Sequence, residues 1–454
     1  MKRADLHFPL SGVDAPVQPG KTPLKNGRTV GVVSLGCAKN LVDTERMLGL
    51  LSEAGFSIVN EPQDADILVV NTCGFIEPAK QESIDTILEM AQYKRRGRCK
   101  TLVVTGCLSQ RYRTELAGEL PEIDVLLGVR EYEKLPALLG APNPCGSAGR
   151  ILATPPYSAY LRIGDGCNNR CAYCAIPLIR GPLSSVAQDA LFDEALQLAD
   201  RGVTELTLIA QDTSGYGVDR YGEPRLAGLL DRLSGIAALH WIRVLYTYPD
   251  TVTPALIDRI RAAGKVVHYL DMPLQHISDS VLQRMNRRGG GAQIRALLEY
   301  LATNAPDFIL RTTMMVGFPG ETDRDFAELT AFLSQYPFDR VGAFAFSPEE
   351  GTAAADMPDQ VEEAVKRARL DALLTQQQEI SHQRALRRVG SVAELLVEGG
   401  DAARLWGRTY GEAPDVDGRV FIPKPGGAPG PVAGSYIPVR LTGALEYDMI
   451  GELL

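Results

Sequence analysis

The stretch Cys167-Asn-Asn-Arg-Cys171-Ala-Tyr-Cys174 places three thiols on one short loop, with an aromatic residue directly before the last of them. Three thiolates in this spacing can hold three irons of a 4Fe–4S cluster, which leaves the fourth iron open to a small molecule. A zinc site usually needs four protein ligands, and no fourth cysteine or histidine lies near this loop in the sequence. Chance clustering of free thiols is the other alternative. The spacing favours the iron–sulfur cluster.

At 454 residues the chain is too long for one hydrophobic core, and roughly two to four domains are expected. Its hydrophobic content of 45% and charged content of 23% are ordinary for a soluble globular protein. No apolar run approaches the ~20 residues that a membrane span needs, and Met1–Lys25 lacks the apolar core of a signal peptide. Eight cysteines, three of them on one loop, fit metal chemistry in a reducing cytosol better than a disulfide framework. We therefore expect a cytoplasmic protein with no membrane partner.

The first structured part of the chain alternates strand-like runs with helical patterns. A helix is expected from about Leu41 to Ala54, and it stops at Gly55. Such alternation predicts a parallel α/β sheet with crossover helices. Residues 1–27 are expected to be a disordered extension, and the Pro, Asn, Gly and Ser residues of 141–149 indicate a linker. The strand-like runs are Thr29–Leu35, Ala65–Asn71, Lys100–Thr105 and Asp124–Val129.

A second alternating series follows the linker. It contains six strand candidates, too few for a standard closed barrel of eight, and an open partial barrel is the expectation. Such barrels carry their chemistry at the carboxyl ends of the strands, and the cysteine loop follows the first candidate. The candidates are Ala159–Ile163, Glu205–Ile209, Trp241–Tyr246, Val266–Leu270, Ile309–Val316 and Arg340–Phe346.

The last part of the chain changes character after a long polar helix pattern over Gln360–Arg388. Short β-like runs separated by Gly and Pro turns predict a small β-barrel. Between Ser391 and Leu454 there are nine acidic and five basic residues, a net charge of −4, and the whole chain carries −9. The chain as a whole therefore does not resemble an electrostatic nucleic-acid binder. The β-like runs are Ala393–Val397, Leu405–Thr409, Arg419–Ile422 and Tyr436–Leu441.

Three further cysteines, Cys37, Cys73 and Cys107, each come where a predicted strand ends. In a parallel sheet these three loops share one edge, so the thiols could converge although they are far apart in sequence. The alternative is three unrelated buried cysteines, which are common as small hydrophobic residues. Spacing alone leaves both readings open.

The loop Cys167–Cys174 resembles the cysteine motif of the radical S-adenosylmethionine (SAM) superfamily, in which SAM chelates the open iron. The resemblance implies that Cys167, Cys171 and Cys174 hold a 4Fe–4S cluster that passes one electron to SAM, which yields methionine and a 5′-deoxyadenosyl radical. Tyr173 sits where that superfamily places an aromatic ring against the adenine, and simple packing beside the loop is its alternative.

The residues around the other three cysteines resemble the methylthiotransferase family. Members combine an N-terminal α/β domain, a radical SAM partial (β/α)6 barrel and a C-terminal β-barrel called TRAM, and the resemblance covers nearly all of Arg28–Leu454. It implies domains over 28–145, 150–388 (with the linking helix) and 389–454. It also implies a second 4Fe–4S cluster on Cys37, Cys73 and Cys107, which carries the sulfur that a second SAM methylates. Cys99 and Cys145 match no family motif.

Two branches of this family differ in substrate. Several segments resemble the RimO branch, which modifies Cβ of an aspartate in the twelfth protein of the small ribosomal subunit. The other branch modifies an adenosine in tRNA and usually has a more basic TRAM barrel, whereas the acidic barrel here suits a basic protein partner. A non-catalytic iron–sulfur protein for electron transfer or regulation is the third alternative. The RimO-like segments are Val33–Asp43, Asn71–Ile76, Asp271–His276 and Ala413–Gly418.

The other candidate residues lie outside the cysteine loops. Gln211 and Asp212 follow the second barrel strand, where SAM contacts are expected, although solvated loop residues fit equally well. Arg311 could neutralise a carboxylate of SAM or substrate, and a structural ion pair is the preferred alternative. Gly317-Phe-Pro-Gly320 indicates a tight turn that either shapes the cofactor pocket or ends the strand. His276 is expected to be structural. The chemistry also requires a reductant, such as flavodoxin or ferredoxin.

Overall fold

The computed structural model describes residues 27–144, 149–424 and 430–454. It separates into two compact units, one formed by the chain up to Asn168 with Ala175–Pro182, the other by Asn169–Cys174 with Leu183–Leu454. The expected extension over 1–27 lies outside the described residues apart from Gly27, as does the middle of the expected linker. The expected domain boundaries stay predictions, because the two units do not follow sequence order.

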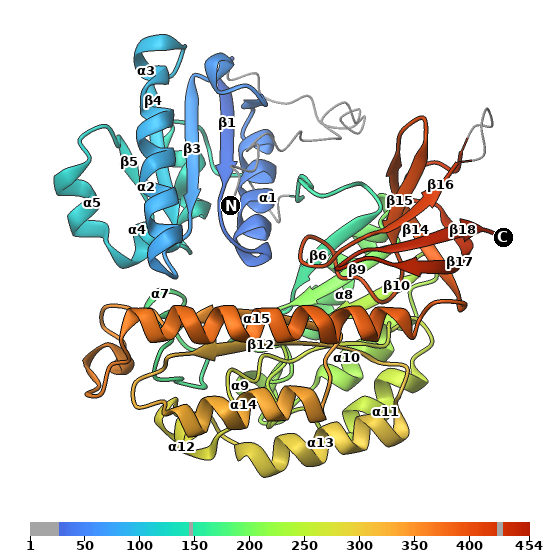
Figure 1. The fold of residues 1–454 in the computed structure, drawn as a ribbon. Coiled ribbons are helices and arrows are strands. Elements are labelled where there is room, and N and C mark those ends of the chain that lie inside the picture. The colour runs from blue at the N-terminus through green and yellow to red at the C-terminus, as the bar shows by residue number, and fades with distance from the viewer. Residues whose placement is uncertain (1–26, 145–148, 425–429) are drawn as a thin grey trace. The chain divides into compact units, whose positions relative to one another are not determined.

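The first unit is built on a five-stranded parallel sheet with the strand order β2-β1-β3-β4-β5 (Figure 1). All six residues of the central strand β3 are buried, as expected where helices cover both faces. The strands of this sheet are β1 (Thr29–Ser34), β2 (Ser57–Ile58), β3 (Ile67–Thr72), β4 (Thr101–Gly106) and β5 (Val125–Leu126). The unit also contains β6 (Ser158–Arg162) and β7 (Gly164–Asp165), which lie outside the sheet. The helices are α1 (Ala38–Glu53), α2 (Glu77–Ala91), α3 (Tyr93–Arg96), α4 (Cys107–Arg111), α5 (Arg113–Glu119), α6 (Leu135–Leu138) and α7 (Ile176–Ile179).

Two separate hydrophobic clusters cover the two faces of this sheet. Met47 and Leu51 of α1 pack with Val69 and other residues of one strand face. Ile87 of α2 packs with Val70 and its neighbours on the other face. Because alternate strand residues point to opposite faces, neighbouring positions of β3 serve different helices. The prediction of a parallel α/β sheet with crossover helices is therefore confirmed.

The second unit begins with the remaining parallel strands. Strand β9 (Glu205–Ile209) pairs with β10 (Trp241–Val244), and β11 (Tyr269–Asp271), β12 (Ile309–Val316) and β13 (Arg340–Ala345) form another parallel sheet. These strands form no closed ring of eight, as expected for a partial barrel. The predicted strand over 266–270 is wrong at its start, because Val266 forms only an isolated bridge to Ile242.

Helices alternate with these strands, and a long helix leads out of the barrel (Figure 1). They are α8 (Gln188–Asp200), α9 (Val218–Tyr221), α10 (Leu226–Ser234), α11 (Pro254–Ala262), α12 (Asp279–Arg284), α13 (Gly290–Asn304), α14 (Asp323–Gln335) and α15 (Glu363–Leu386). None of the described helices is long and apolar enough to cross a membrane.

The chain ends in a closed barrel with the strand order β14-β15-β16-β18-β17. Leu395, Val397 and Ile422 are fully buried inside it, and Ala385 at the end of α15 joins this core. The predicted β-barrel is confirmed, although the last strand was missed. The strands are β14 (Val392–Gly400), β15 (Arg404–Arg408), β16 (Val420–Pro423), β17 (Tyr436–Ala444) and β18 (Met449–Leu453).

Buried ion pairs join this barrel to the amino ends of the parallel strands. Glu205 at the start of β9 accepts hydrogen bonds of 2.8 and 2.6 Å from Arg408 of β15. Arg243 of β10 lies 3.7 Å from the same carboxylate and is fully buried. Such pairs are retained only where both charges are compensated, because unpaired charges are costly in the interior. We call these pairs, with those of Glu412 and Asp417, the joint network.

The second half of the joint network lies on the loop between β15 and β16. Glu412 accepts a hydrogen bond of 2.5 Å from Arg388, and Asp417 accepts one of 2.7 Å from Tyr269. Burial alone would raise the pKa of Glu412, but Arg388 and then Arg340 hold it at about 2. The segment Ala413–Gly418, singled out in the sequence, is thus part of this joint.

His276 is fully buried, in agreement with its expected structural role. Its Nδ1 accepts a hydrogen bond of 3.0 Å from the Ser278 amide, and burial lowers the pKa of the ring to about 4 from the usual 6.5. The folded chain therefore keeps this ring neutral while the unfolded chain protonates it, so stability is lost as the pH falls from 6.5 towards 4.

We expect His276→Asn to reduce this pH dependence. Between pH 7.5 and pH 5 the histidine should cost about 2 kcal/mol of unfolding free energy, because the interval from the unfolded pKa of 6.5 down to pH 5 spans 1.5 pH units. Urea unfolding at both pH values measures the effect. The wild-type chain should lose about 2 kcal/mol more than the variant between the two pH values, and equal losses would contradict the burial argument.

Candidate functional site

Three cysteines of the first unit lie at one edge of its sheet. Cys37 directly precedes α1, Cys73 follows β3 and Cys107 begins α4. Burial raises the pKa of Cys107 to about 12; Arg180 opposes this rise, while Cys37 and Cys73 add to it. Burial also raises the pKa of Cys73, and Cys37 contributes to that rise. The loops that carry the three cysteines lie side by side, because a Cβ on Gly36 would lie 2.9 Å from Cys73 Sγ and a Cβ on Gly74 would lie 3.0 Å from the Cys107 carbonyl carbon.

Two glycines allow this approach. A Cβ on Gly36 would lie 2.8 Å from the Cys73 Cβ and 2.9 Å from its Sγ, and Gly36 has a φ of +87°. A Cβ on Gly106 would lie 2.4 Å from the Thr72 carbonyl oxygen. Side chains at either position would push the cysteine loops apart. The residues before Cys37 and Cys107 therefore have a steric role in the cluster of thiols.

A buried arginine lies beside Cys107. Arg180 donates hydrogen bonds to Asp43 Oδ2 (2.8 Å), to Asn40 Oδ1 (3.2 Å) and to Cys107 Sγ (3.7 Å). Arg162 of β6 lies 2.5 Å from the other oxygen of Asp43. Burial alone would lower the pKa of Arg180, but Asp43 and then Cys107 outweigh it, and the pKa is raised. The arginine stays charged next to the thiol.

The loop Cys167–Cys174 is held at several points. The Cys167 amide donates to the Gly181 carbonyl (3.1 Å) within the first unit. In the second unit, the Cys174 amide donates to the Cys171 carbonyl (3.0 Å), and the Ala172 amide donates to the Met285 carbonyl (2.9 Å). These bonds fix the backbone of the cysteines from both ends of the loop.

The surroundings of Cys171 are aromatic and cationic. Arg287 donates from Nη1 to Cys171 Sγ (3.7 Å) and to Tyr173 Oη (3.0 Å). The Tyr248 hydroxyl lies 4.0 Å from the same sulfur, and the guanidinium lies 4.3 Å from the centre of the Tyr248 ring. Burial raises the pKa of both tyrosines. Both phenols therefore stay protonated at neutral pH.

The donor set suits iron–sulfur chemistry. All seven described cysteines are free thiols. Among the residues that the structure describes, no three His, Cys, Asp or Glu side chains are close enough to hold a single metal ion. A 4Fe–4S cluster does not need this closeness, because each cysteine binds a different iron. Thiolates are the ligands that such a cluster takes.

Three family models match successive parts of the chain. They are the Uncharacterized protein family UPF0004 over residues 29–128, the Radical SAM superfamily over 161–333 and the TRAM domain over 389–454. The Ribosomal protein uS12 methylthiotransferase RimO of Pelotomaculum thermopropionicum is 48% identical over 94% of this chain and 99% of its own. The protein of the same name from Syntrophotalea carbinolica is 46% identical over 94% of this chain and 97% of its own. The chain belongs to the RimO family of methylthiotransferases.

A solved structure agrees on the fold of this RimO-family chain. The radical S-adenosylmethionine methyltransferase TsrM from Kitasatospora setae, with cobalamin and a [4Fe-4S] cluster bound, matches with a TM-score of 0.52. The identity is 13%, and the match covers 72% of this chain and 77% of TsrM, so it bears on the fold alone. Membership of the radical SAM superfamily itself implies an iron–sulfur cluster and SAM.

The other predicted residues fall in different places of the RimO-family fold. Tyr173 packs edge-on against Phe318 as well as bonding to Arg287. Gln211 and Asp212 follow β9 as expected, and Asp212 accepts a hydrogen bond of 2.8 Å from Asn169 on the cysteine loop.

Arg311 lies near the amino end of β12, away from the carboxyl ends where such folds place their chemistry. It donates to Asp271 Oδ1 (2.8 Å) and lies 3.8 Å from Asp417 of the joint network. Burial alone would lower its pKa, but Asp271 outweighs this and the pKa is raised. The geometry therefore favours the structural ion pair that was the preferred alternative.

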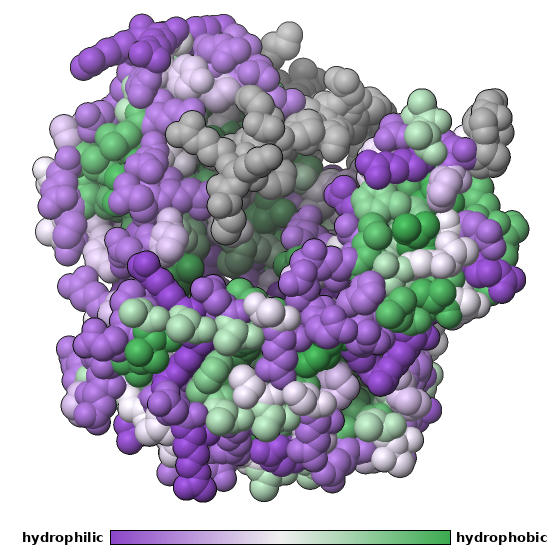
Figure 2. All heavy atoms as spheres, in the orientation of Figure 1, coloured by the Kyte–Doolittle hydropathy of each residue, from purple (hydrophilic) through white to green (hydrophobic). Residues whose placement is uncertain are grey.

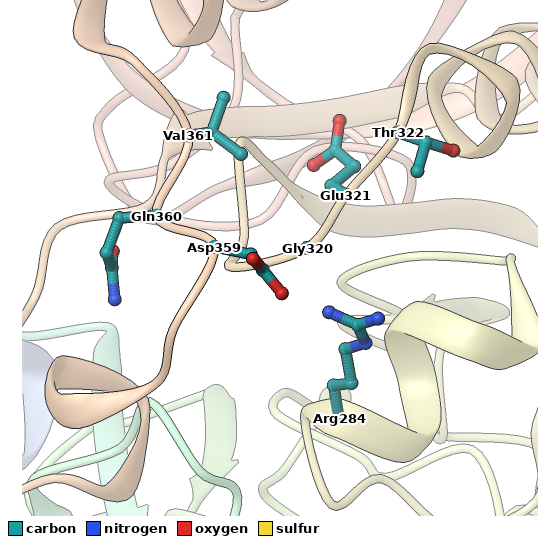
Figure 3. Close-up of a pocket in the computed structure, with 7 residues that line it drawn as sticks. All are labelled: Arg284, Gly320, Glu321, Thr322, Asp359, Gln360 and Val361. Carbon is teal, nitrogen blue, oxygen red and sulfur yellow. The ribbon is translucent and has the colours of Figure 1, made fainter.

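The turn Gly317–Gly320 both ends a strand and borders a cavity. Gly317 and Gly320 have φ values of +71° and +75°, and Glu321 accepts hydrogen bonds from the Gly317 and Phe318 amides. The cavity is a shallow depression of about 390 Å³ that is open to solvent, and Figure 3 shows Arg284 and Asp359 pointing toward each other beside Gly320. A Cβ on Gly320 would collide with Arg284. The positive φ values are what require glycine in this turn, since Arg284 is an exposed, flexible side chain that can move aside.

Sequence reasoning missed Arg180 and Arg287, which contact the proposed ligands. Arg180 is 3% exposed and Arg287 is 9% exposed. Both follow short helical segments and resemble ordinary surface charges in the sequence. The signal that could have found Arg180 is its place six residues after Cys174, in a segment otherwise apolar.

Proposed function

We propose that this protein is a radical SAM methylthiotransferase that adds a methylthio group to Cβ of an aspartate in ribosomal protein uS12. The observation that carries the proposal is the identity of 44–48% with RimO proteins over 93–94% of the chain. The match includes all three parts of the molecule, so the relatives share the fold and the arrangement of its domains. The free thiols at two places in the chain supply the matching chemistry.

The proposed ligands fall into two sets. Cys167, Cys171 and Cys174 would hold the cluster at which SAM binds, with Tyr173 and Gln211 as SAM contacts. Cys37, Cys73 and Cys107 would hold a second cluster. When bound, the two clusters supply an electron for SAM cleavage and a sulfur atom for transfer. The chain itself orients the reactants and excludes water, and its aromatic side chains around Cys171 suit that task.

The C-terminal barrel is the proposed docking site for the ribosomal protein. Its net charge of −4 favours a basic partner. Apolar side chains gather on the visible face of this barrel in Figure 2. Its exposed apolar residues include Val392, Leu445 and Tyr447, which suit contact with a protein better than contact with a phosphate backbone. A one-electron carrier such as flavodoxin or ferredoxin is the proposed reductant, in the cytosol.

A competition assay by mass spectrometry tests this function. The full chain is reconstituted anaerobically with iron and sulfide and then given SAM, a reductant, purified ribosomal protein uS12 and bulk tRNA. We expect a methylthio mass gain on an aspartate of uS12. The same gain on an adenosine of tRNA would overturn the substrate, and SAM that stays uncleaved would favour a non-catalytic iron–sulfur protein.

Cys171→Ala is the test variant for this assay, and Cys99→Ala is its matched control. Cys171 lies on the proposed SAM loop, whereas Cys99 is a buried thiol that contacts the Thr101 carbonyl (3.4 Å). The first variant should lose all SAM cleavage, and the second should retain it. A Cys171→Ala chain that still modifies uS12 would contradict the assignment of the loop.

A further inference from the structure

Arg287 is a buried cation whose contacts all lie around Cys171. Its Nη2 donates to the Pro273 carbonyl (2.6 Å), and its Nη1 donates to both the Tyr173 hydroxyl and the Cys171 sulfur. The Tyr248 ring lies under the guanidinium. These four contacts fix the orientation of the guanidinium, because both of its terminal nitrogens and its flat face are engaged. Arg287 is therefore fixed towards the sulfur rather than mobile near it.

No carboxylate of the described chain compensates this charge at contact distance. Arg287 takes part in no ion pair within 4 Å among the described residues, whereas its exposed neighbour Arg288 pairs with Asp250 at 3.0 Å. The Pro273 carbonyl is neutral, and a tyrosine phenol is ordinarily neutral at pH 7. A buried cation with no counter-charge at contact distance is strongly unfavourable. Of the groups that Arg287 contacts, Cys171 is the one that becomes an anion when it binds iron.

We propose that Arg287 raises the reduction potential of the cluster held by Cys167, Cys171 and Cys174, through its hydrogen bond to the Cys171 sulfur. The inference rests on the proposed function, which assigns these cysteines to a cluster. Reduction adds one electron from a low-potential one-electron carrier and no proton, so the cluster and its thiolates become more negative by one charge. A fixed cation beside one sulfur favours the more negative state, and its low-dielectric surroundings strengthen the effect.

Arg287 is accordingly a positioning residue. Its role is to let a weaker reductant load the electron that SAM cleavage needs. The contact with Tyr173 ties the same guanidinium to the loop residue proposed to face SAM. A purely structural arginine would hold the loop in place without changing the potential, and this difference can be measured.

The test is a redox titration followed by electron paramagnetic resonance. It uses the full chain carrying Cys37→Ala, Cys73→Ala and Cys107→Ala, so that one cluster gives the signal. We expect Arg287→Met to lower the ratio of reduced to oxidised cluster about tenfold at a fixed potential, which is ~59 mV for a one-electron couple. Arg287→Lys keeps the charge but loses the planar guanidinium, so its ratio of reduced to oxidised cluster should lie between those of the wild-type chain and Arg287→Met.

Arg288→Met is the matched control. It removes the same charge at the neighbouring position, where the arginine side chain is exposed. It should leave the ratio unchanged, and SAM binding measured by equilibrium dialysis should change less than about twofold in the Arg287 variants. A wild-type ratio in Arg287→Met, or lost SAM binding with an unchanged ratio, would overturn the inference. If Arg287→Met holds no iron, a wild-type ratio in Arg287→Lys overturns it instead.

The same titration separates this inference from the function on which it rests. A chain with an intact Arg287 that forms no 4Fe–4S signal would contradict the assignment of Cys167, Cys171 and Cys174. A normal signal whose potential ignores Arg287 would leave that assignment standing and remove only the role of the arginine.

Discussion

Replacing Cys37, Cys73 and Cys107 together by alanine is expected to remove about half of the bound iron, to preserve SAM cleavage and to abolish methylthio transfer. The three thiols converge at the carboxyl edge of the first sheet, and none of them belongs to the loop proposed to bind SAM. Iron analysis, 5′-deoxyadenosine release and the mass gain on uS12 measure the three quantities separately.

Cys99→Ala again serves as the control, because it removes one thiol of the same unit that lies outside the converging set. It should keep all of the iron and all of the transfer activity. If SAM cleavage vanished from the triple variant while circular dichroism showed a folded chain, the proposed division of labour between the two sets of cysteines would be wrong.

Glu205→Gln is expected to lower the free energy of unfolding by about 3–5 kcal/mol. The substitution keeps the size of the side chain but leaves Arg408 and Arg243 short of a buried negative charge. Arg408 keeps its second partner, Glu398, at 2.6 Å, whereas the fully buried Arg243 has no other carboxylate in an ion pair among the described residues. Urea unfolding of the full chain without iron measures the loss.

Asp231→Asn is the matched control for this substitution. Asp231 also receives two hydrogen bonds from one arginine, Arg259, but the pair lies at the surface, with side chains 36% and 54% exposed. Water screens such a pair, so its loss should be barely measurable. Equal destabilisation by the two substitutions would show that burial is not what makes the joint network strong.

The sheets and the closed barrel could be predicted from the sequence because their patterns are local. The runs predicted over Glu205–Ile209 and Ile309–Val316 match β9 and β12 residue for residue. Short strands were harder. The two-residue strand β2 is too short to show a period, and β18 follows a turn with few apolar residues before it. The run predicted over Asp124–Val129 shrinks to β5, two residues long.

The convergence of Cys37, Cys73 and Cys107 could be predicted because the carboxyl ends of neighbouring parallel strands meet at one edge. Arg180 and Arg287 could not be predicted, because their burial depends on residues far away in the sequence. Arg287 contacts Cys171 across 116 positions, and Arg180 contacts Asn40 across 140. Arg311 shows the reverse case, since its charge looked functional until Asp271 and Asp417 appeared beside it.

The joint network also determines how far the enzyme can reach. Arg408, Glu412 and Asp417 join the C-terminal barrel to the parallel strands of the same compact unit, through contacts with Glu205, Arg340 and Tyr269. Under the proposed docking role, a substrate bound to that barrel would lie at a fixed distance from Cys171. The enzyme would then select its target aspartate by that distance, and an aspartate a few residues away in the substrate would not reach the site.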